Sequence, residues 1–174
     1  IRDQADYIHL TEKLAELKGQ AFHKKKNLLN QFLRKNPEYK CVKIKKNLLD
    51  ECFQLSKLWC EIKNCEDIGI THEKSAMNEA FSHYDELGMD GIALFINEQL
   101  IAFSIFSIVF NTCIVHFEKF DRNIKGAAQA INWETAKYVR NLCSYINREQ
   151  DLGIGGLRQA KTSYNPDIIS CNYR

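Results

Sequence analysis

Residues 113–132 read CIVHFEKFDRNIKGAAQAIN, and their pattern changes from a strand to a loop and then to a helix. The first eight residues contain enough apolar and β-branched side chains for a buried strand. A period of two places Ile114, His116 and Glu118 on one face, and the residues between them on the other. The sequence therefore predicts that a sheet passes into a helix at this point.

The start of that helix predicts a phosphate site. After a polar loop, apolar residues recur at helical spacing from Gly126 to Leu142. Gly126, Ala127 and Ala128 have almost no side chains, so the first turn can bring backbone N–H groups against a ligand. Because these N–H groups are unpaired and the helix dipole favours an anion, we expect phosphate to bind there.

Hydrophobic periodicity assigns the rest of the chain to helices and strands. The predicted helices cover residues 7–17, 20–35, 48–62, 71–87, 126–142 and 157–164. The predicted strands cover residues 39–44, 91–96, 100–110, 113–120, 144–147 and 168–173. This pattern predicts an α+β fold with a mixed central sheet flanked by helices. We divide it into a basic helical arm over residues 1–36 and a domain over residues 37–174.

Length and hydrophobicity indicate a folded domain without a membrane-spanning segment. With 174 residues the chain can form a domain that buries roughly 70% of its unfolded surface. The longest apolar run, Leu100 to Phe110, is too short to cross a bilayer. The chain starts at Ile1 without a signal peptide, so we expect either a piece of a longer protein or one whose start has been removed.

Cysteine and histidine spacing predicts no metal site. The seven cysteines include no C-x-x-C pair, and the five histidines lack the spacing of zinc ligands. We therefore expect free thiols, as in the reducing cytoplasm, and a cytoplasmic protein. If its function involves a lipid, we expect the protein to be peripheral to the membrane.

Positive charge is concentrated in one stretch. From Lys24 to Lys46 there are nine Lys or Arg residues, including Lys24, Lys25 and Lys26, and one acid, Glu38. Such a stripe suits the phosphates of tRNA or of an anionic phospholipid. The alternative is a solvated helix face that packs against a missing acidic partner domain.

The order of elements after the arm resembles the GNAT acyltransferase fold, also called the acyl-CoA N-acyltransferase fold. In that superfamily the fourth strand leads into a phosphate-binding loop of the form Q/R-x-x-G-x-G/A and then into a helix. Here Asn123-x-x-Gly126-x-Ala128 occupies that place, with Asn instead of Gln or Arg at the first position. The resemblance implies that Asn123, Gly126, Ala127 and Ala128 bind the donor.

A closer resemblance covers nearly the whole chain. The strings YIHLTEKLAELKGQAFHKKKN (7–27), HFEKFDRNIKGAAQAIN (116–132) and YINREQDLGIGGLRQAKTSYNP (145–166) are similar to a bacterial family of uncharacterised proteins. That family is related to the C-terminal domain of phosphatidylglycerol lysyltransferase. It implies that the chain is the second half of a tandem GNAT protein, with an N-terminal GNAT-like half as partner. It also implies no tightly bound cofactor, the donor being aminoacyl-tRNA or acyl-CoA.

The resemblance implies a cleft where the two central parallel strands separate. Glu118 is the first candidate there, as a general base or to hold the ammonium group of a substrate. Its alternative role is a structural ion pair with Lys119, Arg148 or Lys161. His116 is a second catalytic candidate, with neutral packing in the sheet as the alternative.

Charged residues follow the next strand. Together with Arg158, the residues Arg148, Glu149, Asp151 and Lys161 form a predicted anion-binding and internally paired rim. In the alternative interpretation Asp151 caps the following short helix.

Tyr164 follows that short helix. It resembles in position the tyrosine with which many acetyltransferases protonate the leaving thiolate. Its alternative role is to anchor the turn before Pro166.

These observations predict an acyl or aminoacyl transferase that moves an amino acid from aminoacyl-tRNA to a lipid or amine acceptor. One alternative is an N-acetyltransferase that depends on acetyl-CoA. Another, from a different class, is a non-catalytic module that binds RNA or anionic lipid, or that scaffolds a partner.

Overall fold

The computed structural model describes residues 2–61 and 68–171 of the chain. In this part seven strands form one sheet in the order β2-β3-β4-β5-β6-β1-β7. β5 and β6 are parallel, and all other neighbours are antiparallel. The strands are β1 (Ala5–Leu10), β2 (Lys40–Lys43), β3 (Asp90–Ile96), β4 (Gln99–Val109), β5 (Thr112–Phe120), β6 (Tyr145–Asn147) and β7 (Ile168–Cys171). The mixed sheet predicted from the sequence is confirmed.

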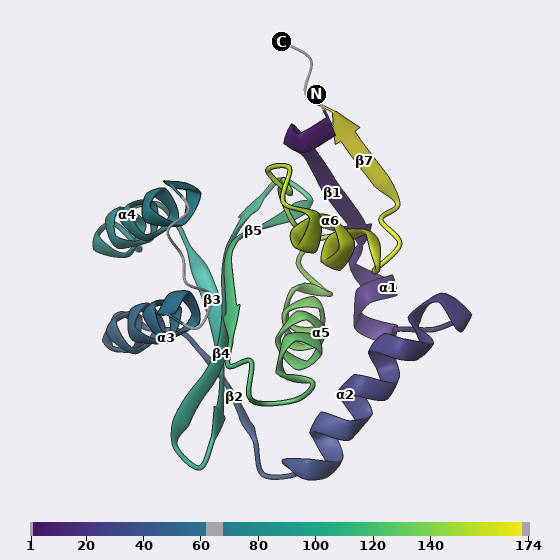
Figure 1. Ribbon diagram of the computed structural model, residues 1–174, viewed down its shortest axis with the longest axis horizontal. Helices are drawn as coiled ribbons and strands as arrows, with labels where there is room; N and C mark the ends of the chain where they lie inside the picture. The colour runs from purple at the N-terminus through teal and green to yellow at the C-terminus, as the bar shows by residue number, and fades with distance from the viewer. Residues whose placement is uncertain (1, 62–67, 172–174) are drawn as a thin grey trace.

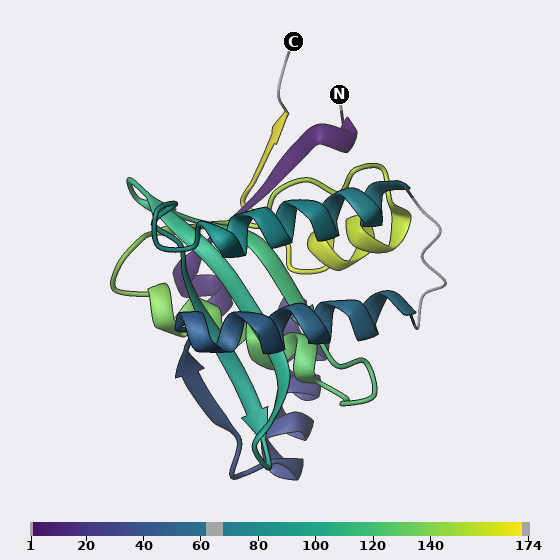
Figure 2. The ribbon, with the colours of Figure 1, turned by 90° about the vertical axis from the view of Figure 1, so that its left-hand side faces the viewer.

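Helices cover both faces of this sheet. Figure 1 shows α3 (Leu49–Glu61) and α4 (Ile68–Ser82) on one side, and α1 (Thr11–Glu16), α2 (His23–Lys35), α5 (Ala127–Val139) and α6 (Gly155–Thr162) on the other. Figure 2, from the side, shows α3 and α4 crossing in front of the strands. The predicted α+β architecture is therefore confirmed.

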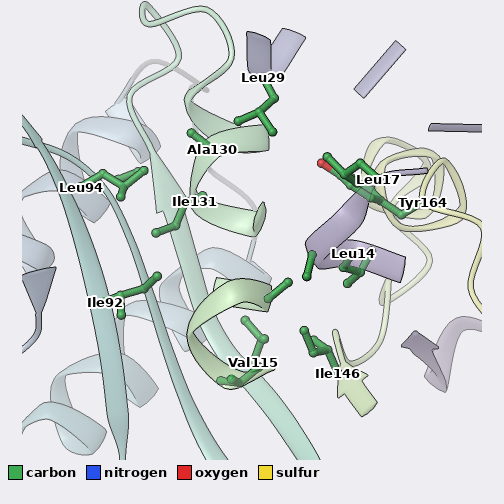
Figure 3. Packing of buried hydrophobic residues seen from close by; sticks show 14 of the residues in the cluster. Leu14, Leu17, Leu29, Ile92, Leu94, Val115, Ala130, Ile131, Ile146 and Tyr164 are labelled. Carbon is green, nitrogen blue, oxygen red and sulfur yellow. The ribbon is translucent and has the colours of Figure 1, made fainter. Parts of the chain in front are cut away.

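Each face of the sheet carries its own hydrophobic core. The first core lies between the sheet and α1, α2 and α5, where Leu14 and Ile131 belong to the same cluster as Ile92 (Figure 3). The second lies under α3 and α4 and includes Cys52. Ile92 belongs to the first core and its neighbour Ala93 to the second, because successive strand residues point to opposite faces.

Helix α2 follows from its local sequence. Residues 23–35 contain no β-branched residue, and Leu29 and Phe32 are buried three positions apart. The helix ends before Asn36, because Pro37 disfavours a helical conformation for the residue that precedes it. The basic residues of α2 therefore lie on a helix whose opposite side is fixed to the first core.

Strand β5 does not keep a single period of two. Its pairing with β4 shifts register so that Val115 and Phe117 have partners on β4 while His116 is an extra residue. This β-bulge changes the face to which the strand presents its side chains. Val115 consequently packs in the first core and Phe117 in the second. The prediction of one alternation that aligns His116 with Glu118 is wrong.

The N-terminal residues also differ from the predicted elements. Residues 5–10 form β1, and α1 occupies only residues 11–16. β1 pairs with β6 and β7, so long-range sheet hydrogen bonds override the local helical pattern. Ala5, Tyr7 and His9 are buried at alternate positions, which is the period of a strand. The helical description of residues 1–36 is therefore wrong for β1.

The other predicted elements are present with shifted ends. α4 begins at Ile68 and ends at Ser82, earlier than predicted at both ends, and α5 ends at Val139. The predicted ends at Ile62 and Tyr173 lie outside the described residues. Within residues 2–61 and 68–171, no helix is both long and apolar enough to cross a membrane.

Candidate functional site

Two neighbouring parallel strands separate near the centre of the sheet. The last pair of residues between β5 and β6 is Ile114 with Asn147, after which β6 ends and β5 continues. Across this opening, Arg148 Nη2 donates to Glu118 Oε1 at 2.7 Å. The two side chains are only 12% and 13% exposed. The ion pair expected as the alternative role of Glu118 is therefore present.

Several polar atoms around this ion pair are unsatisfied. Glu118 Oε2 and Arg148 Nη1 are buried and have no hydrogen-bond partner among the described residues. Ser104 lies opposite Glu118 on β4, and its buried hydroxyl also lacks a hydrogen-bond partner among the described residues. Because buried polar groups are normally hydrogen-bonded, these atoms indicate a place for a polar ligand.

His9 on β1 adds to this group. It is 1% exposed, and both of its ring nitrogens lack a hydrogen-bond partner within the described part of the chain. Burial, followed by the positive charge of Arg148, lowers the pKa of His9 from 6.5 to about 4. At pH 7 the ring is neutral and offers one donor and one acceptor. Sequence reasoning missed His9 because it placed residues 7–17 in a helix; the alternation of residues 5–10 was the available signal.

Tyr164 lies at the edge of the first core near Leu17 (Figure 3). Lys25 Nζ lies 4.4 Å from the centre of its ring, and the guanidinium carbon of Arg148 lies 5.2 Å from it. Burial raises the pKa of Tyr164 to about 12, so its hydroxyl stays protonated at neutral pH. Burial, followed by the charge of Arg148, lowers the pKa of Lys25. Lys25 therefore belongs to this group and not only to the surface stripe.

Lys161 on α6 holds the segment that carries Arg148. Its Nζ donates to the carbonyl oxygen of Arg148 at 2.5 Å and also to that of Gln150. Burial, followed by the charge of Arg148, lowers the pKa of Lys161 to about 8. The amine of Lys161 therefore donates to backbone carbonyl oxygens, and these hydrogen bonds fix the position of Arg148.

Asp151 and Arg158, the other members of the predicted rim, form a separate cluster. Asp151 is fully buried and accepts hydrogen bonds from Tyr7 Oη, from the Gly153 backbone N at 2.9 Å and from Arg158 Nε at 2.8 Å. The hydrogen bond from Arg158 is the largest cause holding the pKa of Asp151 well below its usual range. The N-cap of α6 is Ile154, so the prediction that Asp151 caps this helix is wrong. Asp151 instead ties β1 to the loop after β6.

Gly126 is small because a helix packs against it. A Cβ at this position would lie 2.5 Å from the carbonyl oxygen of Leu28 and 2.8 Å from Phe32 Cβ, both on α2. Ala127 is fully buried, and its backbone N already donates to the Ile124 carbonyl at 3.1 Å. Ala128 is half-buried. On the side where a Cβ would stand, Gly126 is therefore packed against α2.

Asn123 lies away from this contact. It is exposed, and its backbone N donates to Asp121 Oδ1 at 2.8 Å. Asn123 and Asp121 line a cavity of about 420 Å³ that Asp50 and Glu51 of α3 border. Arg122 lines the same cavity, so three carboxylates and one guanidinium surround it.

The basic stripe is divided by the fold. Lys43 pairs with Asp90 at 2.9 Å, and Lys46 pairs with Asp85 at 2.7 Å. Lys24 and Lys26 are exposed on α2. Lys43 and Lys46 are therefore paired with acids, whereas Lys24 and Lys26 lie exposed on α2.

His116 makes a different set of contacts. Its Nε2 lies 2.8 Å from Ser107 Oγ, and its Nδ1 lies 3.1 Å from Glu149 Oε1. Ser107 was not predicted, because only the bulge in β5 brings a serine of β4 to this histidine. In the described ranges, no group of three His, Cys, Asp or Glu side chains is arranged to hold a metal ion.

Comparisons with known proteins agree with this fold. The model of the family described as phosphatidylglycerol lysyltransferase, C-terminal, matches residues 1–174. A conserved protein of unknown function from Bacteroides thetaiotaomicron is 40% identical with a TM-score of 0.93, over 98% of this chain and 58% of its own. The structure of L-PGS from Bacillus licheniformis is 13% identical with a TM-score of 0.66, over 98% of this chain and 59% of its own.

A GCN5-related N-acetyltransferase from Ralstonia eutropha is 9% identical with a TM-score of 0.54, over 78% of this chain and 98% of its own. At such identities the likeness shows the fold alone, and it confirms the predicted GNAT-like fold. The chain spans less than two thirds of the Bacteroides and Bacillus proteins.

Proposed function

Because the chain belongs to the family of phosphatidylglycerol lysyltransferase C-terminal domains, we propose that it moves the aminoacyl group of an aminoacyl-tRNA to a lipid or amine acceptor. The GNAT-like fold supports a less specific statement, namely that the protein has the fold of acyl-transferring enzymes. The observation that carries the proposal is the buried pair of Glu118 and Arg148, in which one carboxylate oxygen and one guanidinium nitrogen have no hydrogen-bond partner among the described residues.

These two free atoms suit the reaction. The acceptor oxygen or nitrogen attacks the carbonyl carbon of the aminoacyl ester, and Glu118 Oε2 takes the proton that the acceptor loses. Negative charge develops on the carbonyl oxygen, where the N–H groups of Arg148 Nη1 stabilise it. The bond between the carbonyl carbon and the ribose oxygen then breaks.

Tyr164 supplies the proton that the ribose oxygen needs. Its raised pKa keeps the hydroxyl protonated, and the ring lies beside Arg148. At the end of the cycle the proton on Glu118 passes to solvent and Tyr164 regains one. In this scheme Lys161 is a positioning residue, because it binds the carbonyl oxygen of Arg148.

The family carries the choice of aminoacyl-tRNA over acetyl-CoA as the donor. α2 packs against Gly126 on the side where a Cβ would stand, and the cavity beside Asn123 is lined by three carboxylates together with Arg122. Neither feature identifies a pyrophosphate site, so the acetyl-CoA alternative rests on the fold alone.

We place the tRNA on the exposed lysines of α2, with Lys24 and Lys26 on its phosphates. Since similar proteins are longer than this chain, we propose that a further GNAT-like half completes the cleft. The protein would act in the cytoplasm and reach a lipid acceptor at the membrane surface.

The experiment is a transfer assay with radiolabelled aminoacyl-tRNA, vesicles that contain phosphatidylglycerol, and a soluble amine. We expect label to enter the lipid or the amine with aminoacyl-tRNA, and none to enter with labelled acetyl-CoA. Transfer of acetyl without transfer of amino acid would reverse the donor assignment.

A further inference from the structure

A second arrangement of polar side chains lies on β4, on the bulge of β5 and after β6. Ser107 Oγ is 2.8 Å from His116 Nε2, and His116 Nδ1 is 3.1 Å from Glu149 Oε1. A hydroxyl, an imidazole and a carboxylate joined in this order are the parts of an activated serine nucleophile. Ser107 and His116 lie on adjacent strands of one hairpin, and Glu149, 33 residues further on, joins them only in the fold.

The hydrogen bonds fix the direction in which a proton can move. An ionised carboxylate only accepts, so His116 Nδ1 carries the hydrogen that points to Glu149. In the neutral ring Nε2 is then the acceptor, and Ser107 Oγ donates to it. His116 is therefore held in the tautomer that removes a proton from Ser107.

The fold positions each part of this arrangement. His116 is the extra residue of the β-bulge, a feature that re-aims side chains beside active sites. Glu149 has a φ of 54°, which is uncommon for a residue with a side chain. Its backbone N donates to Asn147 Oδ1 at 2.7 Å, and Asn147 Nδ2 donates to Asp6 Oδ2 at 2.9 Å. Asn147 and Asp6 thus hold Glu149 in this unusual conformation.

This arrangement is separate from the pair of Glu118 and Arg148. Phe106 packs in the first core, so Ser107, the next residue of β4, points to the opposite face. Ser107 is half-buried, and the side chains of His116 and Glu149 are 25% and 44% exposed. The arrangement therefore reaches the surface of the protein.

We propose that Ser107, His116 and Glu149 form a second catalytic site that hydrolyses carboxylic esters with a small acyl group. Ser107 Oγ bonds to the carbonyl carbon while His116 Nε2 takes its proton, and this proton passes to the alcohol that leaves. Water then attacks the acyl-serine and gives a proton to His116. The carboxylic acid leaves, and the proton returns to Ser107 Oγ. Glu149 is a positioning residue. The proposal does not depend on the transferase function.

The test is covalent labelling of the whole chain with a fluorophosphonate, which reacts with activated serines by forming an O–P bond and releasing fluoride. We expect one label per chain, which peptide mass spectrometry places on Ser107. His116→Ala should slow labelling about 10²-fold or more, as expected for loss of a general base. Ser82 is the internal control, because it is exposed and its Oγ donates to a backbone carbonyl.

Two further measurements separate catalysis from structure. Glu149→Gln should slow labelling, and Glu149→Asp should restore part of the rate, since Asp tolerates a positive φ and keeps the carboxylate. Wild-type protein should release a burst of nitrophenol from p-nitrophenyl acetate, close to one equivalent per chain. Labelling of wild-type Ser107 no faster than of Ser82 would overturn the proposal, and this comparison needs no variant to fold.

Discussion

The carbonyl oxygen of Leu28 occupies the space that a side chain at Gly126 would need, 2.5 Å from the position of a Cβ. This contact joins α2 to the start of α5. The small residue at position 126 therefore serves the packing of two helices, and the same helix brings Lys25 to the ring of Tyr164.

Gly126→Ala should destabilise the protein more than Gly19→Ala. Both glycines have nearly the same φ, 87° and 90°, but in the part of the chain that the structure describes nothing lies within 4 Å of a Cβ at Gly19. Each substitution costs about 1 kcal/mol for the positive φ, and overpacking adds about 1–3 kcal/mol at Gly126 alone. Urea unfolding of the two variants measures the difference. Equal losses of stability would show that α2 does not press on Gly126.

Glu118→Gln should lower the rate of aminoacyl transfer about 10²–10⁴-fold, because an amide cannot take the proton of the acceptor. The measurement is the transfer assay under single-turnover conditions, with circular dichroism to verify the fold. Glu38→Gln is the matched control, since Glu38 is an exposed glutamate. A fully active Glu118→Gln protein would remove this residue from the mechanism.

His9 should make the protein less stable in mild acid. Its pKa is 6.5 when unfolded and about 4 when folded, so between these values the unfolded chain binds more protons. Stability is therefore lost as the pH falls from 6.5 towards 4, by about 3 kcal/mol when the shift is complete. His9→Phe has no group that titrates there and should lose less stability between pH 7 and pH 4.5. Urea unfolding at the two pH values tests this, and identical losses would contradict it.

Exposed and paired lysines should differ in their effect on tRNA binding. Lys24→Ala with Lys26→Ala should reduce the slope of log affinity against log salt by about one unit for each phosphate that is no longer neutralised. Lys43 and Lys46 already pair with acids, so the matched double variant Lys43→Ala with Lys46→Ala should change the slope less. Filter binding of tRNA at several salt concentrations measures both slopes. A larger change of the slope for the Lys43 and Lys46 variant would show that the tRNA does not bind on α2.

Lys161→Met should weaken transfer without removing any group that contacts the substrate. The substitution leaves the carbonyl oxygens of Arg148 and Gln150 without their donor, so the segment that carries Arg148 loses its support. We expect the rate of the chemical step to fall more than the affinity for aminoacyl-tRNA. Single-turnover rates and filter binding separate the two effects. An unchanged rate would show that Arg148 is held by Glu118 alone.

Local sequence signals were sufficient for several elements and for part of the site. The strands β3, β4 and β5 and the helices α2, α3 and α5 follow from periodicity and from breakers such as Pro37. The three helices each bury an apolar stripe, and the three strands are apolar runs bounded by turns, so these patterns can be read without knowing their neighbours. Glu118, Arg148 and Tyr164 were also singled out, because the order of elements and their resemblance to a known fold place them near one opening.

Contacts between distant segments set the remaining features. β1 is a strand because β6 and β7 pair with it from the far end of the chain. One extra residue in β5 separates His116 from Glu118 and joins it to Ser107, and no local pattern marks where such a bulge falls. Gly126 was predicted from its place at the start of a phosphate-binding turn, and the fold adds that α2 packs against it, because contacts between distant segments decide what fills the space beside a glycine.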